Sequence, residues 1–222
     1  MPLTDIVVLS YNDNKQLTRC VRSIWDNCKD YKLILVDNNV INRGFSSGCN
    51  FGANQGSSEY IYLLNSDAYV QPGCLEALLD RFRQHGVGCV GSKQLDPLDH
   101  DRITFGGVLG GPYPYGKHLG GLVSMGNHSL ASRQIWLNGA SLLIKRNLWD
   151  KLKGLNEKFF MFYSDSDFCL RVKELGYSLW YEPNAVVYHK LKSSSSSNNH
   201  LISDQKVFAE IWGKTNPLYT TL

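Results

Sequence analysis

The chain has 222 residues, of which 43% are hydrophobic and 19% charged, and its formal net charge at pH 7 is +3. This length supports one substantial core with a small appendage but not two full domains, and the composition is that of a soluble globular protein. The mild charge argues against nucleic acid as the main partner and is compatible with a phosphorylated small molecule. The sequence has no apolar run long enough for a transmembrane segment and no signal peptide at its start, so we expect a cytoplasmic protein; peripheral membrane contact stays open.

The first hundred residues predict strands and helices in alternation. The elements expected here are strands over 4–10, 32–37, 60–64 and 87–90, and helices over 14–27 (capped by Asn12 or Asp13), 45–54 and 72–85. Such βαβ units cross over right-handed and place parallel strands side by side. We therefore expect an α/β fold with a mixed, mostly parallel central sheet flanked by helices, in which residues 1–100 form a Rossmann-like nucleotide-binding half.

The next segment, 101–190, is expected to form the second half of the same domain. Its glycine-rich stretch 106–121 favours flexible hairpins, with an adjustable wall for a substrate as the alternative. Strands are predicted over 134–137 and 140–144, and a helix over 147–153. The run of serines at 193–197 predicts a flexible linker to a tail helix over 200–213, so that 191–222 would be a flexible serine-rich segment and a tail helix of the same domain.

The most informative stretch lies between residues 159 and 190. Apolar residues recur at helical spacing from Phe168 and end before Gly176, so Asp165 and Asp167 lie at the entrance of a helix. The positive end of a helix favours an ionised carboxylate, as a general base or a metal ligand requires. An ordinary N-cap is the alternative, because Asp and Ser are common there.

A second polar group ends the strand predicted over 60–64. Asn65, Ser66 and Asp67 interrupt an apolar run at the place where ligands bind in open α/β sheets. This position makes Asp67 a candidate ligand for a divalent cation. The alternative is a strand-terminating turn, since all three residue types favour turns.

Together these motifs resemble those of the family 2 glycosyltransferases, and most closely those of bacterial-type rhamnosyltransferase-like members. The similarity runs from about Thr4 to His189 and includes, in order, GFSSGCNFGAN, NSD, WLNGASLLIKRNLW, FFMFYSDSDFCLR and EPNAVVYH. The resemblance implies a GT-A-like single domain. It also implies transfer of a hexose or rhamnose from a UDP- or dTDP-sugar to a glycan or other hydroxyl acceptor, with inversion at the anomeric carbon.

The same resemblance implies the catalytic residues and the cofactor. Asp67 and His189 would bind Mn²⁺ or Mg²⁺, although the family's D-x-D is N-S-D here and so lacks its first acid. Asp165 would be the general base. Because Ser164 replaces the Glu of the family's E-D motif, the choice between Asp165 and Asp167 stays open.

The remaining candidates surround the substrate. Residues expected near the nucleotide are Ser10, Tyr11, Asn12, Asp37, Asn38, Arg43, Asn50, Asn65 and Ser66. Residues expected near the donor sugar or acceptor are Trp136, Asn138, Gly139 and Tyr163.

Other interpretations stay open. A sugar nucleotidyltransferase would need a glycine-rich basic loop after the first strand, and SYNDNKQ has no glycine. A sugar-nucleotide-binding module without catalysis agrees with the missing acids of N-S-D and Ser164. The resemblance also suggests the catalytic domain of a longer glycosyltransferase with further domains, as in some large viruses, which would then act in the host cytoplasm.

Overall fold

The structure is a computed structural model that describes residues 2–110, 116–118, 128–190 and 198–213. Its strands are β1 (Thr4–Ser10), β2 (Tyr31–Asp37), β3 (Tyr60–Asn65), β4 (Ala68–Val70), β5 (Val87–Leu95), β6 (Ile103–Phe105), β7 (Val108–Gly110), β8 (Gly116–His118), β9 (Ser132–Gln134), β10 (Ser141–Lys145) and β11 (Ser178–His189). Its helices are α1 (Asn14–Asn27), α2 (Gly44–Ala53), α3 (Cys74–Arg81), α4 (Arg146–Leu152), α5 (Ser164–Glu174) and α6 (Asn198–Trp212).

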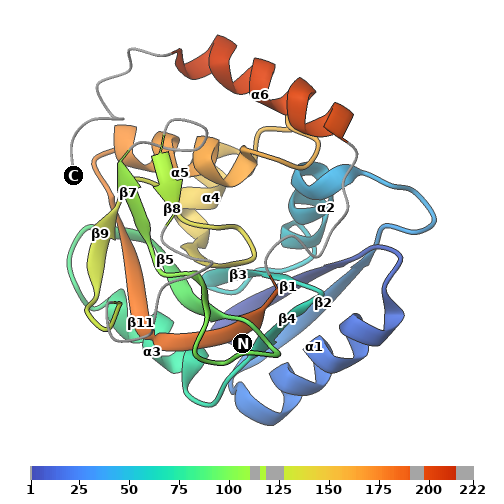
Figure 1. Ribbon diagram of the computed structural model, residues 1–222, viewed down its shortest axis with the longest axis vertical. Coiled ribbons are helices and arrows are strands. Elements are labelled where there is room, and N and C mark those ends of the chain that lie inside the picture. The colour runs from blue at the N-terminus through green and yellow to red at the C-terminus, as the bar shows by residue number, and fades with distance from the viewer. Residues whose placement is uncertain (1, 111–115, 119–127, 191–197, 214–222) are drawn as a thin grey trace.

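A mixed sheet runs through the molecule in the order β2-β1-β3-β10-β5-β11-β4, with β6 beside β5 and β9 beside β11 (Figure 1). Along this path β2, β1, β3, β5 and β11 point one way, while β10 and β4 point the other. This arrangement confirms the expected mixed sheet whose strands mostly run in one direction. Both predicted halves of the chain contribute strands to it.

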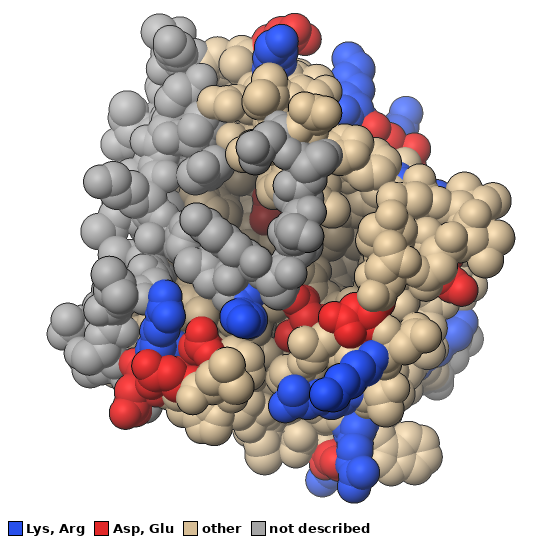
Figure 2. All heavy atoms as spheres, turned by 45° about the vertical axis from the view of Figure 1, so that its right-hand side comes forward, with Lys and Arg blue, Asp and Glu red and all other residues tan. Residues whose placement is uncertain are grey.

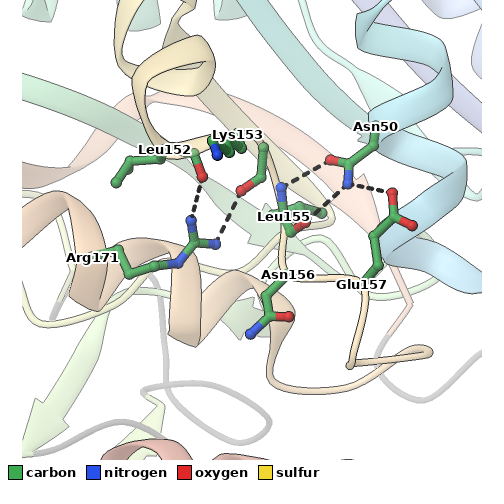
Figure 3. A pocket seen from close by; sticks show the side chains of 8 residues that line it. Asn50, Leu152, Lys153, Leu155, Asn156, Glu157 and Arg171 are labelled. Atoms are coloured by element: carbon green, nitrogen blue, oxygen red, sulfur yellow. Dashed lines mark hydrogen bonds between the residues drawn. The ribbon is translucent and has the colours of Figure 1, made fainter.

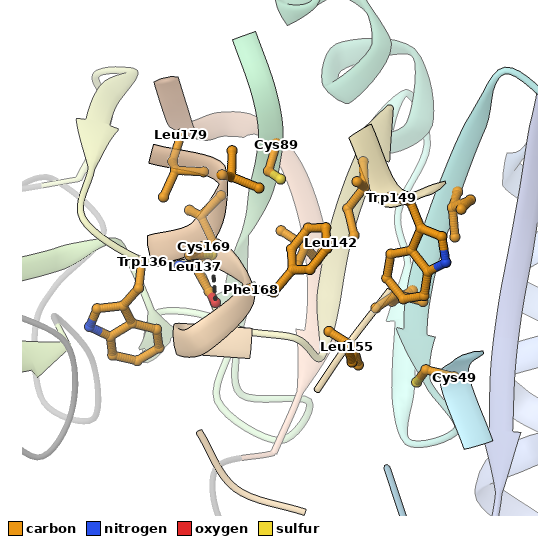
Figure 4. Packing of buried hydrophobic residues seen from close by; sticks show 14 of the residues in the cluster. Cys49, Cys89, Trp136, Leu137, Leu142, Trp149, Leu155, Phe168, Cys169 and Leu179 are labelled. Carbon is orange, nitrogen blue, oxygen red and sulfur yellow. Dashed lines mark hydrogen bonds between the residues drawn. The ribbon is translucent and has the colours of Figure 1, made fainter. Parts of the chain in front are cut away.

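Neighbouring residues of a strand point to opposite faces of the sheet, and helices cover both faces. Val7 packs into a cluster with α2, α4, α5 and α6, whereas Ile6 and Val8 pack into a cluster with α1 and α3. Figure 4 shows part of the first cluster, in which Trp149 and Phe168 join α4 and α5 to the sheet. Their ring centroids are 5.3 Å apart.

Most elements lie where the sequence predicts them. Asp13 is the residue that caps α1, since its side chain accepts a hydrogen bond from the Gln16 amide at 3.0 Å. The strand predicted over 87–90 is longer than expected, because β5 continues to Leu95. The strand predicted over 134–137 is wrong, because β9 ends at Gln134 and Ile135–Leu137 run as irregular chain into the core. Their hydrophobicity reflects burial and not strand pairing.

The glycine-rich stretch contains one described hairpin, in which β7 pairs antiparallel with β8. This pairing agrees with the expected hairpins, while half of the segment, like the serines at 193–197, lies outside the described residues. The tail helix is present as α6. Phe208 and Trp212 of this helix, 0% and 8% exposed, belong to the same core cluster as α4 and α5. The helix is therefore part of the core and not an appendage.

The packing of α6 predicts a large effect for a single truncation. Replacing Phe208 with Ala should lower the free energy of unfolding by about 3 to 5 kcal/mol, the usual cost of removing a buried phenyl ring. Ile202→Ala on the same helix is the control, because Ile202 is 51% exposed and should change stability by no more than about 0.5 kcal/mol. Chemical denaturation followed by circular dichroism measures both. Equal, small effects would show that α6 does not pack as described.

Candidate active site

The strands that run in the common direction all end at one edge of the sheet. Their last residues are Ser10, Asp37, Asn65, Leu95 and His189. The carboxyl edge of such a sheet is where ligands bind in open α/β folds. Figure 2 shows a hollow in the surface with acidic side chains on its floor and along its rim.

Asp67 and His189 lie together at this edge because of strand register. β4 pairs antiparallel with β11 so that Ala68 lies opposite His189, which places the preceding residue, Asp67, beside the imidazole. The His189 Nε2 and Asp67 Oδ1 atoms are 3.4 Å apart, and the two side chains are 11% and 18% exposed. The pair is therefore mostly enclosed but still open on one side.

Gln94 contacts the other side of the imidazole. Its Oε1 lies 2.9 Å from His189 Nδ1, and Gln94 is 1% exposed. With Nδ1 donating to this oxygen, the lone pair of Nε2 points toward Asp67, which is the tautomer that a metal-binding histidine uses. The sequence analysis missed Gln94 because the predicted strand ended at Val90. The available signal was that Gln94 and the apolar Leu95 continue the alternation of the strand beyond Ser92 and Lys93.

A carboxylate and an imidazole are suitable ligands for Mn²⁺ or Mg²⁺. No group of three or more His, Cys, Asp and Glu side chains that could hold a metal occurs within the described ranges. Asp67 and His189 thus fit a cation that takes its other ligands from substrate oxygen atoms and water.

Asp165 is held beside the end of β3 by the turn Asn138–Ala140. Within this turn the Gly139 amide donates to Asp165 Oδ2 at 2.9 Å, and the Ala140 carbonyl accepts from the Asn65 amide at 3.0 Å. A Cβ atom at Gly139 would lie 3.2 Å from the Asp165 Cβ, so the glycine permits this close approach. One short turn therefore joins the carboxylate of α5 to the strand end that precedes Asp67.

The environment of Asp165 favours its protonated form. Burial raises the pKa of its carboxyl above the ordinary value, and the amide hydrogen bonds from Gly139 and Ser166 oppose this rise. The residue lies in the first turn of α5, which begins after Tyr163, a non-glycine residue with φ of +64°. Such backbone strain is common at functional sites. A carboxylate with a raised pKa is suited to accept a proton near neutral pH.

Asp167 has different surroundings. Its side chain is 1% exposed and forms an ion pair with Arg171, with 2.8 Å between Oδ2 and Nε. Its other oxygen accepts from Trp212 Nε1 at 3.0 Å. The remaining guanidinium nitrogens of Arg171 donate to the carbonyls of Leu152 and Gly154 (Figure 3). Asp167 therefore joins α5, α6 and the end of α4.

Of the nine nucleotide candidates, Asn65 ends β3 and Ser66 follows it, and the other seven fall into two groups. Ser10, Tyr11, Asn12 and Asp37 lie at the ends of β1 and β2, where Asn39 links them: its Oδ1 accepts from the Asn12 amide at 2.7 Å and its own amide donates to Asp37 Oδ1 at 2.8 Å. Tyr11 is 48% exposed and Asp37 is exposed, so both are accessible to a ligand. Asn39 is a further candidate in this group that the sequence analysis did not single out.

The other group has its side chains occupied by the protein itself. The side-chain amide of Asn38 donates to the Gly44 carbonyl at 3.1 Å, and the guanidinium carbon of Arg43 lies 4.6 Å from the centre of the Phe51 ring. Asn50 donates to the Leu155 carbonyl at 2.9 Å and accepts from the Leu155 amide, as Figure 3 shows. These contacts stabilise α2 and the loop after α4, so the nucleotide roles of these residues stay predictions.

Of the four donor-sugar candidates, Asn138 and Gly139 belong to the turn Asn138–Ala140. Asn138 Oδ1 accepts from the Ala140 amide at 2.8 Å and so shapes the turn. Trp136 is 5% exposed, and its indole nitrogen has no hydrogen-bond partner among the described residues. Tyr163 is buried and packs 5.2 Å from the Phe208 ring, which places it between α5 and α6. A sugar role for these side chains stays a prediction.

The architecture matches that of solved glycosyltransferases with the GT-A fold. A crystal structure of GalNAc-T7 with UDP, GalNAc and Mn²⁺ superposes with a TM-score of 0.77 at 14% identity, covering 97% of this chain and 49% of that chain. The mannosyltransferase PcManGT from Pyrobaculum calidifontis, in complex with GDP-Man and Mn²⁺, has a TM-score of 0.67 at 15% identity and covers 99% of this chain and 67% of that one. The fold is therefore a GT-A fold.

The family model described as glycosyltransferase like family 2 matches residues 1–206, and the chain belongs to this family. An uncharacterized protein of Sinorhizobium fredii is 33% identical over 171 residues, which are 73% of this chain and 18% of that protein. The N-acetylglucosaminyl-diphospho-decaprenol L-rhamnosyltransferase of Mycobacterium tuberculosis is 27% identical over 173 residues, 67% of this chain and 53% of the enzyme. The chain thus spans about half or less of the length of these relatives. None of the helices in the described ranges is long and apolar enough to cross a membrane.

The two carboxylates of α5 should affect stability in opposite directions. Because the folded-state pKa of Asp165 is raised, its ionisation opposes folding, and stability is lost as pH rises from the unfolded-state pKa through the folded-state pKa. In Asp165→Asn this pH-dependent loss should be absent, because the side chain no longer ionises. Asp167→Asn should be destabilised by about 1 to 3 kcal/mol, because the buried Arg171 and Trp212 groups lose an ionised acceptor. Urea denaturation between pH 4 and pH 8 measures both, and a stabilised Asp167→Asn would contradict the assignment.

Proposed function

We propose that this chain transfers a sugar from a nucleoside-diphosphate sugar to a hydroxyl group of an acceptor, with inversion at the anomeric carbon. The observation that carries the proposal is the turn at 138–140, which joins the partly buried carboxylate of Asp165 to the strand end that precedes Asp67. An inverting transfer needs a base on one side of the sugar and stabilisation of the leaving group on the other. Family membership supports the same reaction class.

Asp165 is the proposed general base, in preference to Asp167. Both oxygens of Asp167 have donors from Arg171 and Trp212. The oxygens of Asp165 accept from the backbone amides of Gly139 and Ser166 and from the Ser166 side chain, and they form no ion pair within the described residues. Asp165 would take the proton of the acceptor hydroxyl while the acceptor oxygen forms its bond to the anomeric carbon. The bond between that carbon and the diphosphate breaks, and the diphosphate leaves with the electron pair.

Asp67 and His189 are the proposed protein ligands of a divalent cation, Mn²⁺ or Mg²⁺. When bound, such a cation neutralises the negative charge that develops on the leaving diphosphate. Both solved neighbours contain Mn²⁺, which supports a divalent cation in this fold. The ends of β1 and β2, with Asn12, Asp37 and Asn39, would bind the base and ribose of the nucleotide, and Trp136 and Asn138 would face the sugar.

The donor and acceptor are proposed only by class. The neighbours were solved with UDP and with GDP-Man, and one relative is named as an L-rhamnosyltransferase, so UDP-, GDP- and dTDP-sugars all belong in a donor panel. Incubation of the chain with each donor and Mn²⁺, followed by detection of free nucleoside diphosphate, tests the proposal. Tight donor binding without release of nucleoside diphosphate would favour a binding module, which Asn65 and Ser164 at the acidic positions of the family motifs also suggest.

Loss of the base should slow turnover without preventing donor binding. Asp165→Asn should lower kcat by about 10² to 10⁴, the range typical for general-base catalysis, while the Kd for the donor stays unchanged. Asp150→Asn is a matched control, because this acid is exposed on α4 and should leave kcat unchanged. Full activity of Asp165→Asn would overturn the assignment of the base.

Removal of a metal ligand should change the requirement for the cation. Asp67→Asn and His189→Ala should each raise the Mn²⁺ concentration needed for half-maximal activity by about tenfold or more. Calorimetric titration of Mn²⁺ into the UDP complex gives a readout that does not depend on turnover. His85→Ala, at an exposed histidine, is the control. Unchanged Mn²⁺ affinity in both ligand variants would place the cation elsewhere.

A further inference from the structure

One face of α6 contacts the segment that leads into the proposed base. His200, Asp204, Phe208 and Trp212 recur at every fourth position and therefore lie along one side of the helix. His200 stacks on Phe160 with 4.2 Å between ring centroids. Phe208 packs against Phe159 and Tyr163, at 6.3 and 5.2 Å, and Trp212 bonds to Asp167.

Asp204 makes the most specific of these contacts. Its side chain is 2% exposed, and its carboxylate accepts hydrogen bonds from three consecutive backbone amides: Phe160 at 3.0 Å, Met161 at 2.8 Å and Phe162 at 2.8 Å. Successive amides that converge on one anionic group fix the path of the backbone that carries them. The buried carboxylate therefore holds residues 160–162 in one conformation.

This segment connects the start of α2 with the start of α5. Directly after it come Tyr163, with its φ of +64°, and then the first turn of α5 with Asp165. On the other side, the Phe160 carbonyl accepts from the Phe45 amide at 2.6 Å, at the start of α2. A displacement of residues 160–162 would therefore be transmitted to Asp165.

We infer that Asp204 is a positioning residue for the proposed base. Loss of the contact between α6 and residues 160–162 would misplace Asp165. This inference rests on the proposed function. Asp204 does not touch the substrate; it acts by holding residues 160–162, which in turn set the start of α5. In this respect α6 is needed for turnover as well as for the stability of the core.

The test compares Asp204→Asn with the unmutated 222-residue chain. Asparagine preserves the size but replaces one acceptor oxygen with an amide group, which repels the amides of residues 160–162. We expect faster hydrogen–deuterium exchange at these residues, an unchanged calorimetric Kd for UDP with Mn²⁺, and a kcat about 10- to 100-fold lower, because a displacement of about 1 Å can cost 10²-fold in rate. All assays are made well below the melting temperature of each variant.

Two controls separate positioning from general destabilisation. Glu210→Gln removes one charge from the same helix at an exposed position and should change none of the three readouts. Ile24→Val weakens the core cluster on the opposite face of the sheet and should lower the melting temperature with kcat unchanged. If Asp204→Asn does not fold, His200→Ala removes only the stacking on Phe160 and should show the same pattern with a smaller decrease in kcat.

The outcomes are distinguishable. Faster exchange at residues 160–162 together with a lower kcat and an unchanged Kd supports the inference. An active wild type whose Asp204→Asn variant shows faster exchange but normal kcat overturns the inference and leaves the proposed function intact. A wild type that binds UDP but releases no nucleoside diphosphate from any donor overturns the proposed function, and the inference with it.

Discussion

The candidate site depends on two hydrogen bonds that backbone groups of one short turn make. The Gly139 amide holds the Asp165 carboxylate, and the Ala140 carbonyl holds the amide of Asn65 at the end of β3. Both bonds come from backbone groups of adjacent residues, so the turn keeps the Asp165 carboxylate close to the end of β3, two residues before Asp67. A substituent at residue 139 would lie against Asp165 and also against the ring of Phe45. This crowding explains why a glycine suits this position.

The two carboxylates of α5 show how neighbouring acids acquire different properties. They are two residues apart in the first turn of one helix and experience the same helix dipole. Asp167 turns into the core, where a guanidinium and an indole satisfy its charge. Asp165 turns toward the sheet edge, where burial without a cationic partner raises its pKa. An acid that opposes folding in its ionised form is a cost in stability that a catalytic role would explain.

The residues that hold the candidate site at the carboxyl edge of the sheet come from elements that are distant in sequence. Strand register places Asp67 beside His189, Gln94 of β5 orients the imidazole, and α6 holds the segment before Asp165 through Asp204. Asp5 and Arg146 form a further buried ion pair at the start of β1, at the end of the sheet opposite the site. Buried contacts therefore hold the edge from within the molecule, while Tyr11, Asn12 and Asp37, at the ends of β1 and β2, stay exposed.

Local patterns in the sequence were sufficient to predict most strands and helices of the first hundred residues, though not β4, as well as the mixed α/β class and the family resemblance. These features depend on local periodicity and on short motifs, which can be read without knowing any long-range contact. The same patterns also indicated Asp67, Asp165 and His189, since each follows or begins an element with a clear pattern.

The contacts that each of these residues makes depend on the tertiary structure alone. The contact of Asp67 with His189 depends on the register of β4 and β11, the role of Asp167 on α4 and α6, and the roles of Gln94 and Asp204 on pairing and packing across more than forty residues of chain. Local sequence patterns carry no information on these contacts, because the contacts form only when the sheet and α6 pack around the core.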